Sequence, residues 1–292
     1  MTNSHDDDQA GDDQAGDDRQ VTYERVEHIA RVTLNRPRYR NAQSRQLLEQ
    51  LDTAFVEASE DPEVRVIVLR GEGESFSAGH DLGTPEQIAD LEARPYEEGM
   101  RGRYKRSWDM NVEFSLRWRN LAKPTIAAVH GYCIFGGWII ASTMDVIIAA
   151  EDAQLLPTNF QYFSVPWDIG ARKTKEILFE SRFLSGTEAC ELGFVNRAVL
   201  ADKLDDEVMS YAGRVAQNDP FQLRMTKLAV NQAQDAQGFT GHIRGAHALH
   251  VLSSIGEGDP AASLPERERT RRRPMVQRAV ENQRLAQERD GG

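Results

Sequence analysis

The chain has 292 residues, of which 40% are hydrophobic, enough for one large α/β domain or one core with a small appended piece. The formal net charge is −11, and residues 1–18 hold seven aspartates and no Lys or Arg, so the acidity belongs mainly to that tail. This balance argues against nucleic-acid binding, and no apolar stretch reaches the length of a membrane span. The two cysteines, Cys133 and Cys190, lack metal-ligand spacing, so we expect no metal site and a reducing, cytoplasmic location.

The elements follow in chain order. Residues 1–20 repeat a DDQAG-like unit with little apolar content, which predicts a disordered acidic tail. Two short strands, 21–26 and 28–34, predict a hairpin, and one apolar face over 47–58 predicts a helix. Buried strands are predicted at 64–69, 125–129 and 146–149, a helix at 136–143, and a last short strand at 194–199. Helices are predicted at 171–180, 187–192, 202–217, 220–233 and 238–254, with a solvated helix or frayed tail at 267–289. Strands that alternate with helices indicate an α/β fold with a mostly parallel sheet.

Two glycine-containing loops follow buried strands. The first runs from Arg70 to Leu82, where small residues let a ligand approach the backbone closely. The second runs from His130 to Trp138, and its Gly136-Gly137 pair opens a helix. A helix start offers unpaired N–H groups that suit an oxygen becoming negative. Either loop alone is weak evidence, and neither fits a phosphate-loop or dinucleotide pattern.

Together the loops resemble the crotonase (enoyl-CoA hydratase/isomerase) superfamily, over roughly residues 21–256. The blocks that carry the resemblance are LNRP at 34–37, RNA at 40–42, FSAGHDL at 76–82, KPTIAAVHGY at 123–132, GG at 136–137 and ACELGFVNR at 189–197. The resemblance implies a crotonase-like ββα superhelix over residues 21–200 and a C-terminal helical oligomerisation region over 201–292. It also implies an acyl-CoA substrate, no cofactor beyond the coenzyme A of that substrate, and a homo-trimer or hexamer.

The resemblance implies an oxyanion hole made of the backbone N–H groups of His80 and Gly136. The His80 side chain then has two interpretations, a pocket wall or a base. Three cationic residues, Arg38, Arg40 and Lys227, match positions that contact the coenzyme A phosphates, although ordinary surface charge explains them equally well. The other residues expected to line the substrate site are Ala78, Asp81, Leu82, Trp138, Ile139, Asn159 and Trp167. Asp81 is also expected to fix its loop by accepting backbone hydrogen bonds, and Trp138 and Trp167 are alternatively core residues.

The sequence departs from the hydratase pattern at two positions. Hydration of an enoyl thioester needs two positioned carboxylates, and here Ile139 and Asn159 stand where the family places glutamates. The stretch from Asn159 to Gly170 is also shorter than usual. Asp168 is the remaining ionisable candidate, with a pKa raised by the apolar bulk of Trp167; alternatively, it caps the helix that starts near Ile169.

These features leave two interpretations of function. The first is an enzyme that stabilises an acyl-CoA enolate with an atypical acid/base set, acting on a hydrophobic acyl group. The second is a non-catalytic acyl-CoA-binding protein or oligomeric partner of the same fold. Retention of both loops favours the first, and loss of both glutamates favours the second.

Overall fold

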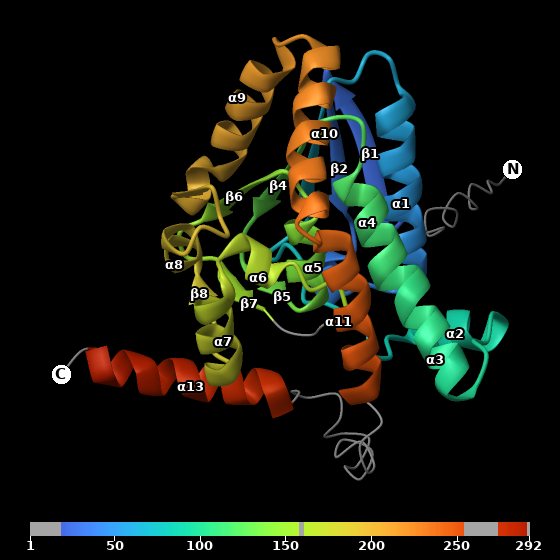
Figure 1. Cartoon of the computed structure of the whole chain (residues 1–292), viewed down its shortest axis with the longest axis vertical. Helices are drawn as coiled ribbons and strands as arrows, with labels where there is room; N and C mark the ends of the chain where they lie inside the picture. The colour runs from blue at the N-terminus through green and yellow to red at the C-terminus, as the bar shows by residue number, and fades with distance from the viewer. Residues whose placement is uncertain (1–18, 158–160, 254–273, 291–292) are drawn as a thin grey trace, which may run out of the picture.

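A computed structural model describes residues 19–157, 161–253 and 274–290 of the chain. Most of the predicted acidic tail, Asn159 and the first part of the predicted C-terminal helix or tail, residues 267–273, lie outside the described residues. The main sheet has six strands in the order β1-β2-β3-β4-β6-β9 (Figure 1). Its strands are β1 (Val21–Val26), β2 (Ile29–Leu34), β3 (Val66–Gly71), β4 (Thr125–Val129), β6 (Val146–Ala150) and β9 (Arg197–Val199).

Only the hairpin β1–β2 is antiparallel, and every other pair in the main sheet is parallel. A second sheet of three short strands has the order β5-β7-β8. Its strands are β5 (Tyr132–Ile134), β7 (Gln154–Leu156) and β8 (Leu184–Ser185). The fold is therefore α/β with a mostly parallel sheet, as predicted.

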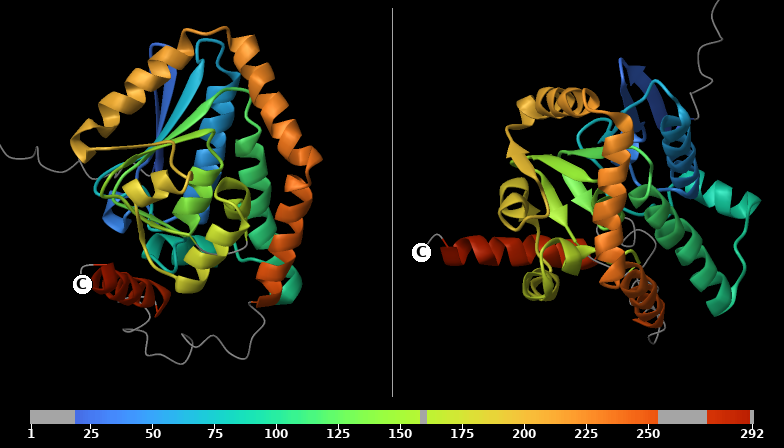
Figure 2. Two further views of the ribbon diagram at one scale, coloured as in Figure 1. Left: turned by 60° about the vertical axis from the view of Figure 1, so that its left-hand side comes forward. Right: turned by 45° about the horizontal axis from the view of Figure 1, so that its top comes forward.

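Helices surround the sheets, and the C-terminal third of the described chain is mainly helical (Figure 2). Helix α1 contacts β1, β2 and β3, whereas α9 contacts β2, β3, β4 and β6. The longer helices are α1 (Arg45–Glu60), α2 (Pro85–Ala93), α3 (Gly99–Ser107), α7 (Ala171–Glu180), α9 (Leu204–Ala216), α10 (Pro220–Ala236), α11 (Phe239–Ser253) and α13 (Pro274–Asp290). The short ones are α4 (Phe114–Arg119), α5 (Gly136–Ser142), α6 (Val165–Asp168) and α8 (Gly186–Glu191), with the 3-10 turns η1 (Pro37–Tyr39) and η3 (Ala201–Lys203) and the π-helical turn η2 (Trp108–Glu113).

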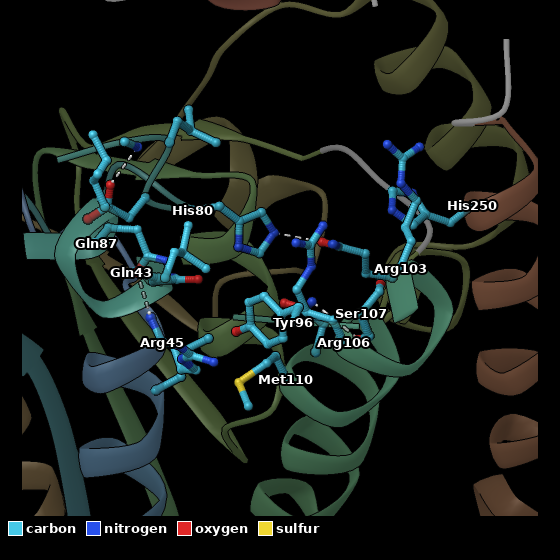
Figure 3. A pocket seen from close by; sticks show the side chains of 18 of the residues that line it. Gln43, Arg45, His80, Gln87, Tyr96, Arg103, Arg106, Ser107, Met110 and His250 are labelled. Carbon is cyan, nitrogen blue, oxygen red and sulfur yellow. Dashed lines mark hydrogen bonds between the residues drawn. The ribbon is translucent and has the colours of Figure 1, made fainter. Parts of the chain in front are cut away.

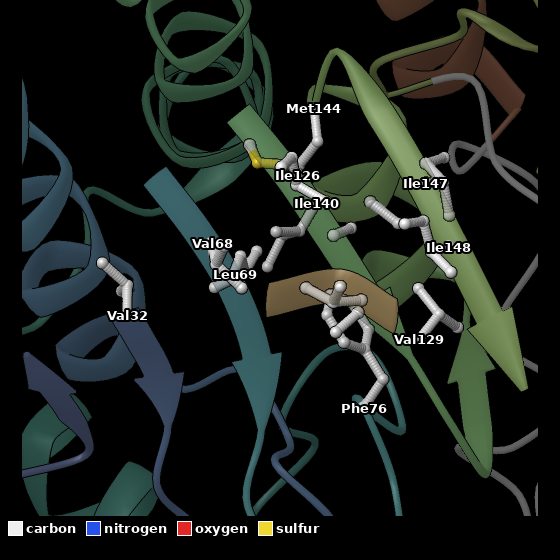
Figure 4. Packing of buried hydrophobic residues seen from close by; sticks show 14 of the residues in the cluster. Val32, Val68, Leu69, Phe76, Ile126, Val129, Ile140, Met144, Ile147 and Ile148 are labelled. Atoms are coloured by element: carbon white, nitrogen blue, oxygen red, sulfur yellow. The ribbon is translucent and has the colours of Figure 1, made fainter. Parts of the chain in front are cut away.

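The core lies between the parallel strands and the helices packed on them (Figure 4). Strand β3 shows why: four of its six residues, 66–69, are buried apolar side chains, as expected for a strand covered on both faces. Phe76 is fully buried just beyond β3, so the first glycine loop starts from an anchored position. Both loops thus leave the C-terminal ends of adjacent, rigid strands.

The sequence analysis missed elements between residues 83 and 122. This stretch contains α2, α3, the π-helical turn and α4, of which the last three form one continuous helical rod. Helix α3 holds two glycines and four basic residues in nine positions, so it carries no apolar stripe that a periodicity argument detects. No helix in the described part of the chain is long and apolar enough to cross a membrane.

Candidate active site

The two glycine loops are hydrogen-bonded to each other. The Ser77 N–H donates to the Tyr132 carbonyl at 2.9 Å, and the Ile134 N–H donates to the Ser77 carbonyl at 3.0 Å. A Cβ on Gly137 would lie 2.7 Å from the Ser77 carbonyl oxygen, so this close approach requires glycine. The first loop is therefore fixed against the second just before residue 80 and just before residue 136.

Gly136 faces the first loop directly. A Cβ on Gly136 would lie 3.1 Å from the His80 ring, and a Cβ on Gly79, whose φ is +87°, would lie 3.3 Å from the Gly136 nitrogen. Phe135 holds the Gly136 amide in place from a strained conformation, with φ 49° and ψ −103°. Its side chain is buried and anchored in a cluster that includes Ala279 of α13. Strain of this kind persists only where the surroundings enforce it, and it concentrates at functional sites.

His80 opens onto a cavity of about 620 Å³, the first cavity (Figure 3). The His80 Nε2 lies 2.6 Å from the Gln161 Oε1, which fixes the ring at the cavity wall. The wall comes from α1, the 80–83 loop, α2, α3, the π-helical turn and α11, and it combines apolar side chains with several polar and basic ones. Its residues are Gln43, Arg45, Leu48, His80, Asp81, Leu82, Gly83, Gln87, Ile88, Leu91, Tyr96, Arg103, Arg106, Ser107, Met110, Asn111, Gln161, His250 and Val251.

Asp81 holds the first loop together. Its carboxylate accepts hydrogen bonds from the N–H groups of Gly83 (3.0 Å) and Thr84 (2.9 Å) and pairs with Arg36 at 2.8 Å. Burial opposes ionisation, but the hydrogen bonds from Thr84, Arg36 and Gly83 prevail and lower the pKa of Asp81. Its side chain is 0% exposed, so the structural role expected for Asp81 is the one observed. Leu82, by contrast, is 59% exposed at the rim.

Three residues expected to line the substrate site lie elsewhere. Trp138 is 2% exposed and stacks on Phe194 with ring centroids 3.6 Å apart, so it is a core residue. Ile139 is buried in a separate apolar cluster with Phe239. Trp167 packs against that cluster and donates its indole N–H to His242 at 2.9 Å. None of these three apolar side chains lines the first cavity, so they do not form the hydrophobic acyl pocket expected there.

Asp168 lines a second cavity of about 440 Å³. Ser142, the last residue of α5, and the following Thr143 line the same cavity. Burial raises the pKa of Asp168 to about 7, against a hydrogen bond from the Ser164 hydroxyl at 2.8 Å that lowers it. The raised pKa agrees with the prediction, but Asp168 and His80 line different cavities. The alternative that Asp168 caps a helix is wrong, because it ends α6 and the next helix, α7, starts after Gly170.

The predicted phosphate-binding residues separate into two places. Lys227 lines the second cavity, is 8% exposed, and pairs with Asp145 at 2.8 Å while donating to the Lys123 carbonyl. This internal pairing explains Lys227 better than a phosphate contact. Arg38 and Arg40 are exposed beside the first loop, where the Arg40 carbonyl accepts the Ala78 N–H at 2.8 Å. Their guanidinium groups lie over Tyr39 and Tyr132, respectively.

The sequence analysis missed much of the first cavity's wall. Tyr96, Arg103 and Arg106 come from the stretch where no element was predicted, and His250 comes from α11, about 170 residues after His80. Burial, with smaller contributions from the neighbouring His247, His80 and Arg103, lowers the pKa of His250 to about 4. A basic run at 101–106 was the available signal. Within 19–157, 161–253 and 274–290, no group of three or more His, Cys, Asp or Glu could hold a metal ion.

Comparisons with known proteins agree on one family. The family model described as enoyl-CoA hydratase/isomerase matches residues 24–250. A Mycobacterium tuberculosis protein named "Putative enoyl-CoA hydratase EchA13" is 36% identical over 260 residues, 82% of each chain. A crystal structure titled "probable enoyl-CoA hydratase" from Mycobacterium thermoresistibile is 41% identical with a TM-score of 0.73, covering 80% of this chain and 96% of that one. An enoyl-CoA hydratase/isomerase structure from Xanthobacter autotrophicus Py2 is 32% identical with a TM-score of 0.73, covering 83% and 89%.

Proposed function

The chain belongs to the enoyl-CoA hydratase/isomerase (crotonase) family, and from this premise we propose that it binds an acyl-CoA thioester and stabilises the derived enolate. The N–H groups of His80 and Gly136 donate to the thioester oxygen, which gains negative charge when a proton leaves the α-carbon. Donors fixed in advance stabilise such charge without reorganising during the reaction, and one donor is worth about 3–4 kcal/mol. The observation that supports this proposal is the hydrogen-bonded junction of the two loops at Ser77.

The nucleotide part of the thioester lies on the Arg38 and Arg40 side of the first loop in this proposal. Both side chains are exposed there, and neither lines the first cavity. Cationic groups at this position suit the phosphates of coenzyme A. The acyl group then extends from His80 into the first cavity, whose volume of about 620 Å³ is ordinary for a ligand pocket.

A second function has one observation in its favour. Ile139, where a typical hydratase carries a glutamate, is 3% exposed in an apolar cluster and exchanges no proton. A protein that binds acyl-CoA without turning it over fits this position. Turnover of any member of a panel of enoyl-, dienoyl- and β-ketoacyl-CoA thioesters excludes the non-catalytic function. Binding across the panel without turnover supports it.

The oxyanion hole is tested by the stretching frequency of the bound carbonyl. Crotonyl-CoA labelled with ¹³C at the thioester carbonyl is added to the protein, and difference infrared spectra are recorded. Two hydrogen bonds polarise the carbonyl and lower its frequency. Gly137→Ala places a Cβ 2.7 Å from the Ser77 carbonyl oxygen and forces the loops apart, so the shift should shrink. Gly213→Ala in α9 is the matched control, because its Cβ meets nothing within 4 Å.

Two outcomes would count against the oxyanion hole. One is a bound carbonyl with the same frequency as in free solution. The other is a shift that Gly137→Ala leaves intact, because the close approach of the loops would then be irrelevant to the carbonyl. No binding of any acyl-CoA would overturn the whole proposal.

We also propose a homo-trimer or a pair of trimers. Helix α10 has no buried residue. Large apolar side chains stay exposed along α10 and α11, including Phe221 (68%), Val230 (59%) and Leu249 (62%). Exposed apolar groups gathered in this way mark association surfaces. Sedimentation equilibrium tests the assembly, and a monomer at micromolar concentration would contradict it.

A further inference from the structure

The wall of the first cavity carries positive charge where the face of a packed helix is ordinarily apolar. Residues 103, 106, 107 and 110 recur at helical spacing, and all four line the cavity. Two of these four positions hold arginines, Arg103 and Arg106. Figure 3 shows both side chains beside the cavity, with Arg106 near Tyr96 and Arg103 near His250.

The other charged groups of this wall are neutralised locally. Arg45 donates to Asp90 and to the carbonyls of Asp90 and Arg94, and its side chain is 8% exposed. Asp81 pairs with Arg36. Neither group therefore offsets the charge of Arg106.

Arg106 is the best placed of these groups to receive an anion. Its guanidinium lies 4.9 Å from the centroid of the Tyr96 ring, and that of Arg45 lies 4.4 Å from the same centroid, so both groups contact Tyr96. Among the described residues Arg106 forms no ion pair with a carboxylate. Glu97 and Glu98 line a neighbouring cavity that shares Tyr96, Arg103 and Arg106 with the first. The face of Arg106 toward the first cavity is open to a ligand.

The remaining lining supports a polar ligand. Four side-chain amides lie on the wall, those of Gln43, Gln87, Asn111 and Gln161. The N–H groups of a side-chain amide donate hydrogen bonds to a carboxylate. Burial is the main cause that lowers the pKa of His250 to about 4, so its imidazole adds no charge to the wall near pH 7. The wall of the cavity thus combines two arginines with hydrogen-bonding groups, and neither Arg38 nor Arg40 belongs to it.

We propose that the acyl group of the substrate carries an anionic group, a carboxylate at its distal end, which binds the Arg106 guanidinium with Arg103 beside it. This inference rests on the proposed acyl-CoA function and narrows it to carboxylated acyl thioesters. A guanidinium matches a carboxylate with two parallel hydrogen bonds, and stacking on Tyr96 holds its plane in position. The apolar residues Leu48, Ile88 and Leu91 contact the chain between thioester and carboxylate.

Matched pairs of thioesters test the proposal. Succinyl- and butyryl-CoA, glutaryl- and pentanoyl-CoA, and adipoyl- and hexanoyl-CoA have equal chain lengths and differ in a terminal carboxylate. All are saturated, so none has a double bond to hydrate, and calorimetry reports their binding. At least one carboxylated member should bind about tenfold or more tightly than its partner, the range of one charge-assisted hydrogen bond.

Three variants on α3 locate the effect. Arg106→Gln should remove the preference for the carboxylated member and leave the affinity of its alkyl partner unchanged. Arg106→Glu should reverse the preference, because two carboxylates then face each other. Arg101→Gln is the matched control, since Arg101 lies on the same helix and lines none of the three cavities.

Each contrary result has a distinct meaning. Equal affinities within all three pairs, or a preference that survives Arg106→Gln, would overturn the proposal. So would an equal loss of affinity for both members in Arg106→Gln, because Arg106 would then bind the phosphates of coenzyme A. If no thioester binds at all, the proposed function itself fails.

Discussion

Replacing Asp168 with asparagine is expected to stabilise the protein above neutral pH and to change little in acid. The carboxyl group lines the second cavity, and burial raises its pKa from an ordinary 3.8 to about 7. Each pKa unit corresponds to about 1.4 kcal/mol, so the difference of about three units amounts to about 4 kcal/mol. Water entering the cavity reduces this cost, which makes about 4 kcal/mol an upper limit.

The sign of the effect follows from proton linkage. Between about pH 4 and pH 7 the folded protein holds the Asp168 proton more tightly than the unfolded chain does. Its contribution to stability is therefore fully present below the ordinary pKa and is lost as the pH rises to about 7. Asparagine does not titrate, so the difference in stability between the variant and the parent should grow across this range and then level off.

Urea unfolding followed by tryptophan fluorescence measures this difference at half-unit pH steps. Ser164→Ala removes the hydrogen bond that lowers the pKa of Asp168, so this pKa should rise. In this variant the loss of stability with rising pH should therefore continue to a higher pH than in the parent. A pH-independent difference between Asp168→Asn and the parent would refute the reasoning, because the carboxyl would then titrate as it does in water. Because Asp168 and His80 line separate cavities, acyl-CoA binding should be the same in both proteins.

Three further outcomes are expected. Lys227→Met should lower the free energy of unfolding in urea by about 1–3 kcal/mol, because it leaves Asp145 without its ion pair. Adding Asp145→Asn should restore part of this loss, and neither variant should change acyl-CoA affinity. A selective loss of affinity in Lys227→Met would instead indicate that Lys227 contacts a phosphate. Asp81→Asn should lower the free energy of unfolding by about 2–4 kcal/mol at pH 7 and by less in acid. The pKa of Asp81 is lowered in the folded protein, so its carboxylate stabilises the fold above its ordinary pKa and loses this effect as the pH falls. A loss of stability that is the same at every pH would contradict this. Removal of residues 274–292 should lower the melting temperature and weaken acyl-CoA binding, because Ala279 packs on the cluster that holds Phe135; unchanged binding would separate α13 from the site.

The buried strands were predictable because burial on both faces leaves a continuous apolar signal. Strand β4 has the bounds predicted for it, Thr125–Val129, and the hairpin of β1 and β2 was also correct. The strands β5, β7 and β8 were missed because two or three residues cannot establish a period. Helix α3 was missed for a different reason. The face of α3 that lines the first cavity carries Arg103 and Arg106 instead of apolar core residues. The helix therefore lacks the apolar periodicity by which a helix is predicted from sequence.

The glycine loops were predictable for a similar physical reason, since close backbone approach excludes side chains and leaves a readable pattern. Side chains beyond the glycines were not. Trp138 follows Gly137 directly, yet the turn of α5 directs it into the core against Phe194. Sequence neighbours of a glycine that opens a helix can point to any side of that helix, so their distance along the chain does not place them in the cavity.

The separation of the two cavities limits the chemistry that this fold can perform. Helix α5 begins at Gly136, beside His80, and its last residue, Ser142, lines the second cavity with Asp168. Seven residues at 1.5 Å each give α5 a length of about 10 Å, so its two ends lie at different cavities. In the function proposed above, proton transfer at a thioester held by residues 80 and 136 would use groups on the wall of the first cavity. The imidazoles on the described part of that wall belong to His80 and His250, and because burial lowers the pKa of His250 to about 4, the search for the acid and the base begins at His80 in the first loop.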